Sequence, residues 1–262
     1  MVETKVKNQW ALILGGSSGL GLASAQKLAL DGFNIIIVHR SPRSELTGIQ
    51  KEFDVIRETG VRLIDFNKDA LNPVQQKNMV AEIRKEISPE GKINCLLHSI
   101  AKGNLKPMTG ENALSTEDFS ITLQAMATSF YDWVRLIFNA SLFAKDARLL
   151  AFTSEGSSRP LPNYAAISAA KAALEAMMRS IALEFAPYGI RANCIQAGVT
   201  DTRSLQMIPG SDEIKKVTQN RNPFGRLTTP RDVADVVSLL CLPEAAWING
   251  CVIPVDGGEH LC

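Results

Sequence analysis

Short apolar runs alternate with segments of helical periodicity along the chain. The apolar runs are predicted to form strands at 10–14, 34–38, 61–66, 93–97, 148–153, 190–195 and 247–255. Helices are predicted from the first glycine turn to residue 30, at 51–58, 73–87 and 129–142, after residue 163, and at 230–241. This alternation, without an internal repeat or a low-complexity linker, predicts one Rossmann-type, doubly wound parallel α/β sheet in a single domain, 1–262.

The first predicted strand ends in a glycine-rich turn, Gly15-Gly-Ser-Ser-Gly-Leu-Gly21, and a helix follows it. Turn glycines let the backbone approach a pyrophosphate, and a helix N-terminus offers N–H groups and the positive end of a dipole. Contacts to a dinucleotide are therefore expected from Gly15, Ser17, Ser18, Gly19 and Leu20. The alternative is a structural turn without a ligand.

The tip of the second predicted strand reads His39-Arg40-Ser41 and has no acidic residue. An acidic side chain there would accept hydrogen bonds from the ribose 2′-OH of NAD. Arg40 and Ser41, with Ser17, Ser18 or Arg43 nearby, are instead suited to a 2′-phosphate. The tip predicts NADPH, with NADH possible, and the alternative is that Arg40 is a solvated charge.

The tips of the third and fourth predicted strands are also expected to face the cofactor. Asp69 and Ala70 follow the third strand, where an aspartate can accept from the adenine amino group. Ser99, Ile100 and Ala101 follow the fourth. These five residues are predicted to line the nucleotide site.

A phenol and an ammonium group stand close together in the stretch 151–178. Asn163 is a plausible N-cap, and the alanine-rich run after it favours a helix. Tyr164 and Lys171 would then share one helix face, roughly 10 Å apart along the axis. The positive charge is expected to lower the phenol pKa and make a proton-donating pair. The alternative is a surface tyrosine and a solvated lysine.

Two long polar stretches follow predicted strands and are candidates for function. Residues 102–118 form a long loop with Gly103, Pro107 and Gly110. Residues 203–225 are polar except for a few apolar points, and a lid over the substrate is predicted at about 199–226. A plain surface loop is the alternative for the second stretch.

Composition narrows the function classes further. The 28 basic and 27 acidic residues leave a net charge of +1, so neither nucleic acid nor an anionic membrane is an expected partner. Apolar residues make up 45%, which suits a globular domain with a large core. With no signal peptide and no apolar run of roughly 18 residues, a cytoplasmic protein is expected. The five scattered cysteines predict reduced, mostly buried thiols, and the three histidines lack metal-ligand spacing.

Several of these motifs together resemble the short-chain dehydrogenase/reductase superfamily. They are the glycine turn 15–21, the Asp69 tip, Ser154, Lys171, Gly198-x-x-x-Thr202 and Val255-Asp-Gly-Gly258. The resemblance covers nearly the whole chain. It implies a Rossmann domain, a nicotinamide cofactor and a homotetramer.

The departures from the usual superfamily pattern are informative. Most members carry Tyr-x-x-x-Lys, but Ile167 stands four residues before Lys171, and the usual active-site asparagine falls near Met126. Tyr164 and Lys171 instead have the Tyr-x6-Lys spacing that resembles enoyl-acyl-carrier-protein reductases. A second tyrosine that those enzymes often carry ten residues before the first is replaced by Ser154.

The resemblance implies a role for each of these residues. Lys171 would hold the nicotinamide ribose, and Gly198, Thr200 and Thr202 would lie at the carboxamide. Tyr164 would stabilise or protonate the enolate, with Ser154 sharing the role. The leading hypothesis is an NADPH-dependent enoyl-thioester reductase of fatty acid biosynthesis, with its substrate on acyl-carrier protein or coenzyme A.

Two other functions stay open on the sequence. One is reduction of another enone or of a carbonyl in the same fold. The other is a nucleotide-binding protein without catalysis, against which the Tyr164–Lys171 pair counts because binding alone does not require it.

Overall fold

A parallel sheet forms the centre of the molecule. The computed structural model describes residues 8–87, 89–208 and 210–262. Within these residues seven parallel strands lie in the order β3-β2-β1-β4-β5-β6-β7. Their bounds are β1 Gln9–Leu14, β2 Asn34–His39, β3 Leu63–Asn67, β4 Lys92–His98, β5 Phe143–Ser154, β6 Arg191–Ala197 and β7 Val252–Val255. The predicted doubly wound fold is confirmed.

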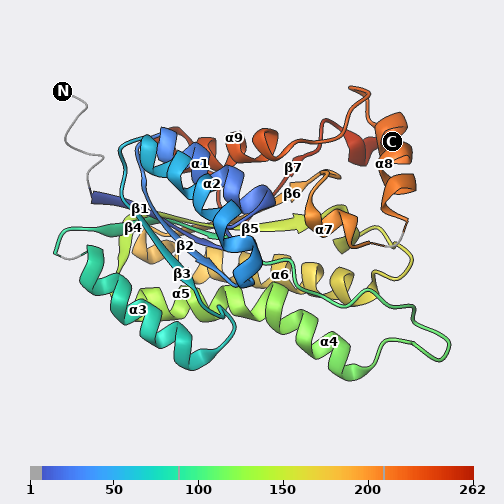
Figure 1. Ribbon diagram of the computed structural model, residues 1–262, viewed down its shortest axis with the longest axis horizontal. Helices are drawn as coiled ribbons and strands as arrows, with labels where there is room; N and C mark the ends of the chain where they lie inside the picture. Colours follow the sequence, from blue (N-terminus) through green and yellow to red (C-terminus); the bar gives the residue numbers. More distant parts are fainter. Residues whose placement is uncertain (1–7, 88, 209) are drawn as a thin grey trace.

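Helices cover both faces of the sheet (Figure 1). One layer is built from α1 (Gly19–Leu30), α2 (Leu46–Glu58) and α9 (Pro230–Cys241). The other contains α3 (Pro73–Ile87), α5 (Ser129–Asn139) and α6 (Ala165–Glu184), with α4 (Thr116–Leu123) on the same side. Two shorter helices, α7 (Arg203–Gln206) and α8 (Ser211–Arg221), follow β6.

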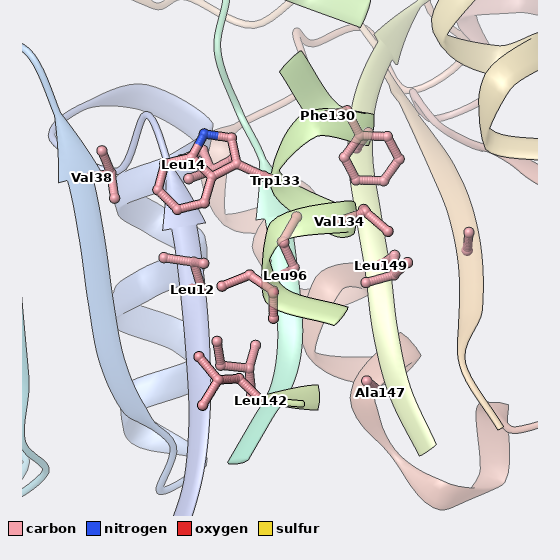
Figure 2. Close-up of a cluster of buried hydrophobic side chains, with 14 of the residues drawn as sticks. Leu12, Leu14, Val38, Leu96, Phe130, Trp133, Val134, Leu142, Ala147 and Leu149 are labelled. Atoms are coloured by element: carbon pink, nitrogen blue, oxygen red, sulfur yellow. The ribbon is translucent and has the colours of Figure 1, made fainter. Parts of the chain in front are cut away.

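Successive side chains along a strand point to opposite faces of the sheet and belong to two separate hydrophobic cores. In β1, Leu12 and Leu14 face the α3–α5–α6 layer, whereas Ala11 and Ile13 face the α1–α2–α9 layer. Trp133 of α5 is fully buried over the first of these faces, as Figure 2 shows. Its indole Nε1 donates to the Ala70 carbonyl oxygen at 2.9 Å, so the core also secures the chain after β3.

The order of the strands places a ligand crevice at a defined point. The chain moves outward from β1 to β2 and β3, then returns to form β4 on the other side of β1. Beyond the carboxyl ends of β1 and β4 the two halves diverge, which is where open α/β sheets bind ligands. Figure 1 shows α7, α8 and the loop before α4 at the end of the sheet where β5 finishes.

Some predicted boundaries are wrong, and the backbone gives the reason. The last strand was expected at 247–255 but begins at Val252, because Gly250 has φ +75° and Trp247 is 97% exposed. The helix expected at 129–142 ends at Asn139, followed by Ser141 at φ 56°. The helix expected at 51–58 begins earlier, at Leu46.

Candidate active site

The glycine turn after β1 is shaped so that side chains are excluded from it. Gly15 has φ +86°, and a Cβ there would lie 2.6 Å from the Ser99 carbonyl oxygen. A Cβ on Gly21 would lie 2.3 Å from the Gly15 oxygen. The Ser18 side chain makes no capping hydrogen bond to α1, and the first turn of α1 has no acidic residue. The helix N-terminus therefore remains open to an anionic group, as a pyrophosphate requires.

Polar side chains gather beside this turn at the tip of β2. Ser41 Oγ donates to Ser17 Oγ at 3.3 Å and lies 2.9 Å from His39 Nδ1. Arg40 is exposed, and its guanidinium donates to Asp69 Oδ2 at 3.1 Å. The four predicted nucleotide-binding residues Ser17, Arg40, Ser41 and Asp69 are thus brought together, with His39 buried beneath them.

The groups expected to meet the adenine already have local partners. Asp69 Oδ1 accepts from the Leu71 amide at 2.9 Å, while its other oxygen accepts from Arg40. The Ala70 carbonyl oxygen accepts from Gln76 Nε2 at 2.7 Å as well as from Trp133. Asp69 thus retains lone pairs for a base, whereas the Ala70 carbonyl is committed to the core.

The tip of β4 lies directly against the glycine turn. The Ser99 amide donates to the Leu14 carbonyl oxygen at 2.8 Å. Ser99 and Ile100 are half-buried and Ala101 is exposed. The three predicted residues therefore lie where the carboxyl ends of β1 and β4 meet.

The segment after β6 closes the other side of the crevice. The Gly198 amide donates to the Val255 oxygen at 3.1 Å, and a Cβ on Gly198 would lie 2.4 Å from Thr228 Oγ1. Thr200 Oγ1 donates to the Gly198 oxygen at 2.9 Å. A Cβ on Gly19 would lie 3.5 Å from Thr202 Cγ2, so the 198–202 segment reaches the glycine turn.

The predicted catalytic residues come from β5 and the start of α6. Ser154 ends β5, Tyr164 immediately precedes α6, and Lys171 lies in the second turn of α6. Lys171 is buried, and its Nζ donates to the Phe152 carbonyl oxygen at 2.7 Å. A Cβ on Gly156 would lie 2.7 Å from Tyr164 Cε1, so this glycine lets the phenol ring lie against the loop after β5.

The start of α6 differs from the prediction. Asn163 is not the N-cap: it has φ 61°, and the capping residue is Tyr164, without a side-chain capping bond. Asn163 tolerates the left-handed region better than most residues, so it forms the turn into the helix instead. Tyr164 therefore lies just outside the helix that carries Lys171.

The electrostatics of the pair also differ from expectation. Burial raises the pKa of Tyr164 above its usual value, and the neighbouring Ser154 hydroxyl only partly offsets this. Burial lowers the pKa of Lys171 to about 8. The expected lowering of the phenol pKa by Lys171 is therefore wrong, because loss of solvation outweighs any effect of the distant ammonium.

Ser154 Oγ is a buried polar atom with an open bonding position. It lies near enough to Tyr164 to influence its pKa, yet it makes no hydrogen bond of normal geometry among the described residues. Buried hydroxyls are nearly always paired in native proteins. A ligand oxygen placed between Ser154 and Tyr164 would complete both groups.

The position usually held by the superfamily tyrosine belongs to an apolar cluster. Ile167 packs with Met126 and Ala170, and a Cβ on Gly103 would lie 3.0 Å from Ile167 Cγ1. Met126 itself lies in a π-helical turn, Gln124–Thr128, between α4 and α5. Neither Ile167 nor Met126 offers a proton.

The predicted lid is more ordered than its composition indicates. Residues 203–225 contain α7 and α8, and Arg221 at the end of α8 forms two ion pairs. Arg221 Nη2 lies 2.8 Å from Glu155 Oε2 and 2.8 Å from Glu259 Oε1. Glu259 Oε2 also accepts from the Val199 amide at 3.2 Å. This cluster joins the lid to the loop after Ser154, and no sequence spacing reveals it.

A second cluster anchors the loop expected at 102–118. Asp118 accepts from Lys106 Nζ at 2.9 Å and from Asn104 Nδ2 at 2.8 Å. Asp118 also forms a capping box with Ser115 at the start of α4. The hydrogen bonds from the Ser115 backbone, Lys106 and the Ser115 hydroxyl lower the pKa of Asp118 to about 2, so its carboxylate holds the loop throughout the neutral range.

Neither the cysteines nor the possible metal ligands among the described residues form a further site. All five cysteines are free, but only Cys95 and Cys194 are buried, so the expectation of mostly buried thiols is wrong for Cys251 and Cys262, which are exposed. Among the described residues no group of His, Cys, Asp and Glu is arranged to hold a metal ion. No helix in the described part of the chain is long and apolar enough to cross a membrane.

Comparison with known proteins gives relatives over the whole chain. Residues 15–260 match the family described as enoyl-(acyl carrier protein) reductase. Mouse peroxisomal 2,4-dienoyl-CoA reductase is 29% identical over 257 residues, covering 98% of this chain and 85% of that protein. A tropinone reductase homolog of Arabidopsis thaliana is 28% identical over 265 residues, covering 99% and 95% respectively.

Solved structures agree with the fold. The enoyl-[acyl-carrier-protein] reductase (NADH) of Aquifex aeolicus superposes with a TM-score of 0.84 at 24% identity, covering 98% of both chains. A short-chain dehydrogenase of Burkholderia cenocepacia, solved with NADP, has a TM-score of 0.83 at 25% identity, covering 98% of this chain and 99% of that one.

Fold and family match together define an oxidoreductase of the Rossmann type. Residues 15–260, nearly the whole chain, match the family described as enoyl-(acyl carrier protein) reductase. The protein therefore belongs to that family, within the short-chain dehydrogenase/reductase superfamily.

Proposed function

We propose that this protein reduces the C2=C3 double bond of a trans-2-enoyl thioester with hydride from NADPH. The observation that carries the proposal is the placement of Tyr164 beside the unpaired Ser154 hydroxyl, while apolar Ile167 fills the usual tyrosine position. The proposed proton donor, Tyr164, is the N-cap of α6 and stands three residues before the position that the tyrosine holds in the common superfamily pattern.

The displacement matches the geometry of enoyl reduction. In ketone reduction, hydride and proton go to adjacent atoms of one carbonyl. In enoyl-thioester reduction, hydride goes to C3 while negative charge develops on the thioester oxygen at C1. Moving the donor three residues back from Ile167, to the N-cap of α6, shifts it roughly 4.5 Å at the rise of a helix, the order of distance that two extra carbons require.

The chain's own residues would bind the cofactor and stabilise the developing charge. Bound NADPH supplies the hydride, and it would be held by the glycine turn, the β2 tip and the 198–202 segment. Tyr164, whose raised pKa keeps the phenol protonated near neutral pH, donates to the thioester oxygen. Ser154 contributes a second hydroxyl to the same oxygen. Lys171, buried at the Phe152 carbonyl oxygen, would hold the nicotinamide ribose and contribute a positive charge.

The preference for NADPH over NADH rests on the β2 tip. Arg40 and Ser41 lie beside Ser17 with no carboxylate from β2 to hold a ribose 2′-OH. Asp69 orients Arg40, whose exposed guanidinium keeps further N–H groups that could donate to a 2′-phosphate. A charge-assisted contact of this kind favours the phosphorylated cofactor.

The proposed function also includes a lid over the substrate, an assembly and a pathway. Helices α7 and α8 lie beyond the end of the sheet where β5 finishes (Figure 1), where they would enclose an acyl chain carried on acyl-carrier protein or coenzyme A. We further propose a cytoplasmic homotetramer acting in fatty acid biosynthesis.

A second candidate is reduction of a conjugated dienoyl thioester or of a carbonyl. Two relatives favour it, since mouse peroxisomal 2,4-dienoyl-CoA reductase and a tropinone reductase homolog match almost the whole chain. Enoyl-acyl-carrier-protein reductases often have a tyrosine at the position of Ser154. In this second candidate function the Ser154 hydroxyl would make more of the contact to the substrate oxygen.

The test is oxidation of NADPH and NADH with four substrates: crotonyl-CoA, a longer trans-2-enoyl thioester, a 2,4-dienoyl thioester and a 3-ketoacyl thioester. Enoyl activity without keto activity is the expected result. Tyr164→Phe is expected to lower enoyl turnover about 100-fold or more while NADPH binding stays intact. Keto activity alone, or unchanged turnover in Tyr164→Phe, would overturn the proposal.

A further inference from the structure

His98 is a buried histidine on the same side of the sheet as Lys171, and it has no role in the chemistry above. It ends β4 and is 1% exposed, with its ring against Phe130 of α5 at 5.8 Å between centroids. Its ring therefore lies on the α5–α6 side of the sheet, the side from which Lys171 also approaches. His98 pairs in register with Ala151 of β5, and Lys171 Nζ bonds to the next residue, Phe152.

The hydrogen bonds around His98 determine its tautomer. Ser129 Oγ donates its only hydrogen to the Ala125 carbonyl oxygen at 2.9 Å. It also lies 2.8 Å from His98 Nε2, so it can only accept there. With that bond in place, Nε2 carries the hydrogen and Nδ1 presents a lone pair. Burial and the Lys171 charge lower the pKa of His98 to about 3, which keeps the ring neutral.

An unpaired acceptor and an incompletely paired donor thus occupy one buried region. His98 Nδ1 has no hydrogen-bond partner among the described residues. The Lys171 ammonium has three N–H groups, and in the described chain its hydrogen bond goes to Phe152 alone. Leaving such groups unpaired in the interior costs free energy, so complementary ones are normally joined directly or through an enclosed water.

We propose that the Lys171 ammonium donates to one enclosed water, that this water donates to His98 Nδ1, and that His98 is thereby a positioning residue for this lysine. The inference rests on the proposed function in one respect, that Lys171 must be charged and correctly placed for turnover. Ser129 and Ala125 act one step further back, because they select the tautomer that can accept.

Other titratable groups near Lys171 act on it in known directions. Glu175, on the same helix, and Cys194 of β6 both raise the pKa of Lys171, against the larger effect of burial. Glu175 accepts from Thr153 Oγ1 at 2.6 Å, which holds it on this side of the sheet. Variants at His98 leave these groups in place, so a changed Lys171 pKa would report the loss of the Nδ1 acceptor.

Two amide substitutions separate the two nitrogens of the ring. His98→Asn places an amide oxygen near the position of Nδ1, whereas His98→Gln places an amide nitrogen near Nε2 and keeps only the Ser129 contact. Losing an acceptor disfavours the charged lysine, so His98→Gln is expected to move the basic limb of NADPH binding about one pH unit lower. His98→Asn is expected to restore most of that shift. Equal shifts in both variants, or none in either, would overturn the inference.

The tautomer is measured without any substrate. Long-range ¹H–¹⁵N spectra of histidine-labelled protein, with the His98 signals assigned by loss in His98→Asn, distinguish Nε2–H from Nδ1–H. A neutral Nε2–H ring between pH 5 and pH 8 is expected, and an Nδ1–H ring would refute the proposal. Because spectra and cofactor titrations need no acyl substrate, failure of the enoyl-reductase proposal would leave these results interpretable.

Discussion

Raising the pH above neutral is expected to weaken cofactor binding because Lys171 loses its charge. Burial lowers the pKa of this lysine from 10.5 to about 8, whereas it raises the pKa of Tyr164 above 10.0. Between pH 7 and pH 9 the lysine therefore changes charge while the phenol does not. The two groups of the pair can be told apart by titration.

The size of the effect follows from the lowered pKa. One pH unit below a pKa of about 8, roughly nine-tenths of Lys171 is protonated, and one unit above it roughly one-tenth is. If the charged form binds NADPH, the association constant falls about tenfold between pH 7 and pH 9. Unfolding does not explain such a loss, because a lysine pKa that is lower in the folded state adds stability as the pH rises from about 8 toward 10.5.

The assay is fluorescence titration of the free enzyme with NADPH from pH 6.5 to pH 9.5 at constant ionic strength. Binding to the free enzyme reports the free-enzyme pKa. Tyr164→Phe is the matched control and should keep the same basic limb. Constant affinity up to pH 9.5 would refute the role of the Lys171 charge, and loss of the limb in Tyr164→Phe would assign it to the phenol.

Three further substitutions test the nucleotide site and the lid. Arg40→Ala should weaken NADPH about tenfold and NADH less than about twofold, measured as dissociation constants, and equal losses would contradict the phosphate contact. Arg221→Gln should raise KM for the enoyl thioester several-fold, because it releases α8 from Glu155, and NADPH affinity should stay nearly unchanged. An unchanged KM would show that these ion pairs do not hold the lid. Gly15→Ala should lower stability by about 2 kcal/mol in thermal unfolding, since φ is +86° and the added Cβ meets backbone at 2.6 Å, whereas wild-type stability would disprove the tight turn.

Sequence reasoning was most reliable where a pattern is local. Apolar runs and helical periodicity predicted the order of strands and helices, and α3 was predicted at its observed bounds, Pro73–Ile87. The glycine turn was recognised because few residues other than glycine tolerate its backbone. Strand ends were less accurate, as at β7, because exposed residues such as Trp247 extend the apolar pattern beyond the sheet.

The candidate site could be predicted only in part. From the order of the elements we predicted that the β2 tip, the glycine turn and the Tyr-x6-Lys pair lie at the same edge of the sheet. The reason is that parallel strands bring their carboxyl ends to one edge. It did not reveal the Arg221–Glu155–Glu259 cluster, whose members are 38 or more residues apart, nor the bond between His98 and Ser129, which are 31 residues apart.

By itself, therefore, the sequence determined the doubly wound fold and indicated the glycine turn and the Tyr164–Lys171 pair of the candidate site, because each depends on residues close together in the chain or on a repeated pattern. The tertiary structure alone decided the charge states. The pKa values of Tyr164 and Lys171 move apart because both groups lose solvent, and loss of solvent depends on every segment packed around them. Spacing along a helix records which side chains share a face, but it carries no information about how deeply that face is buried.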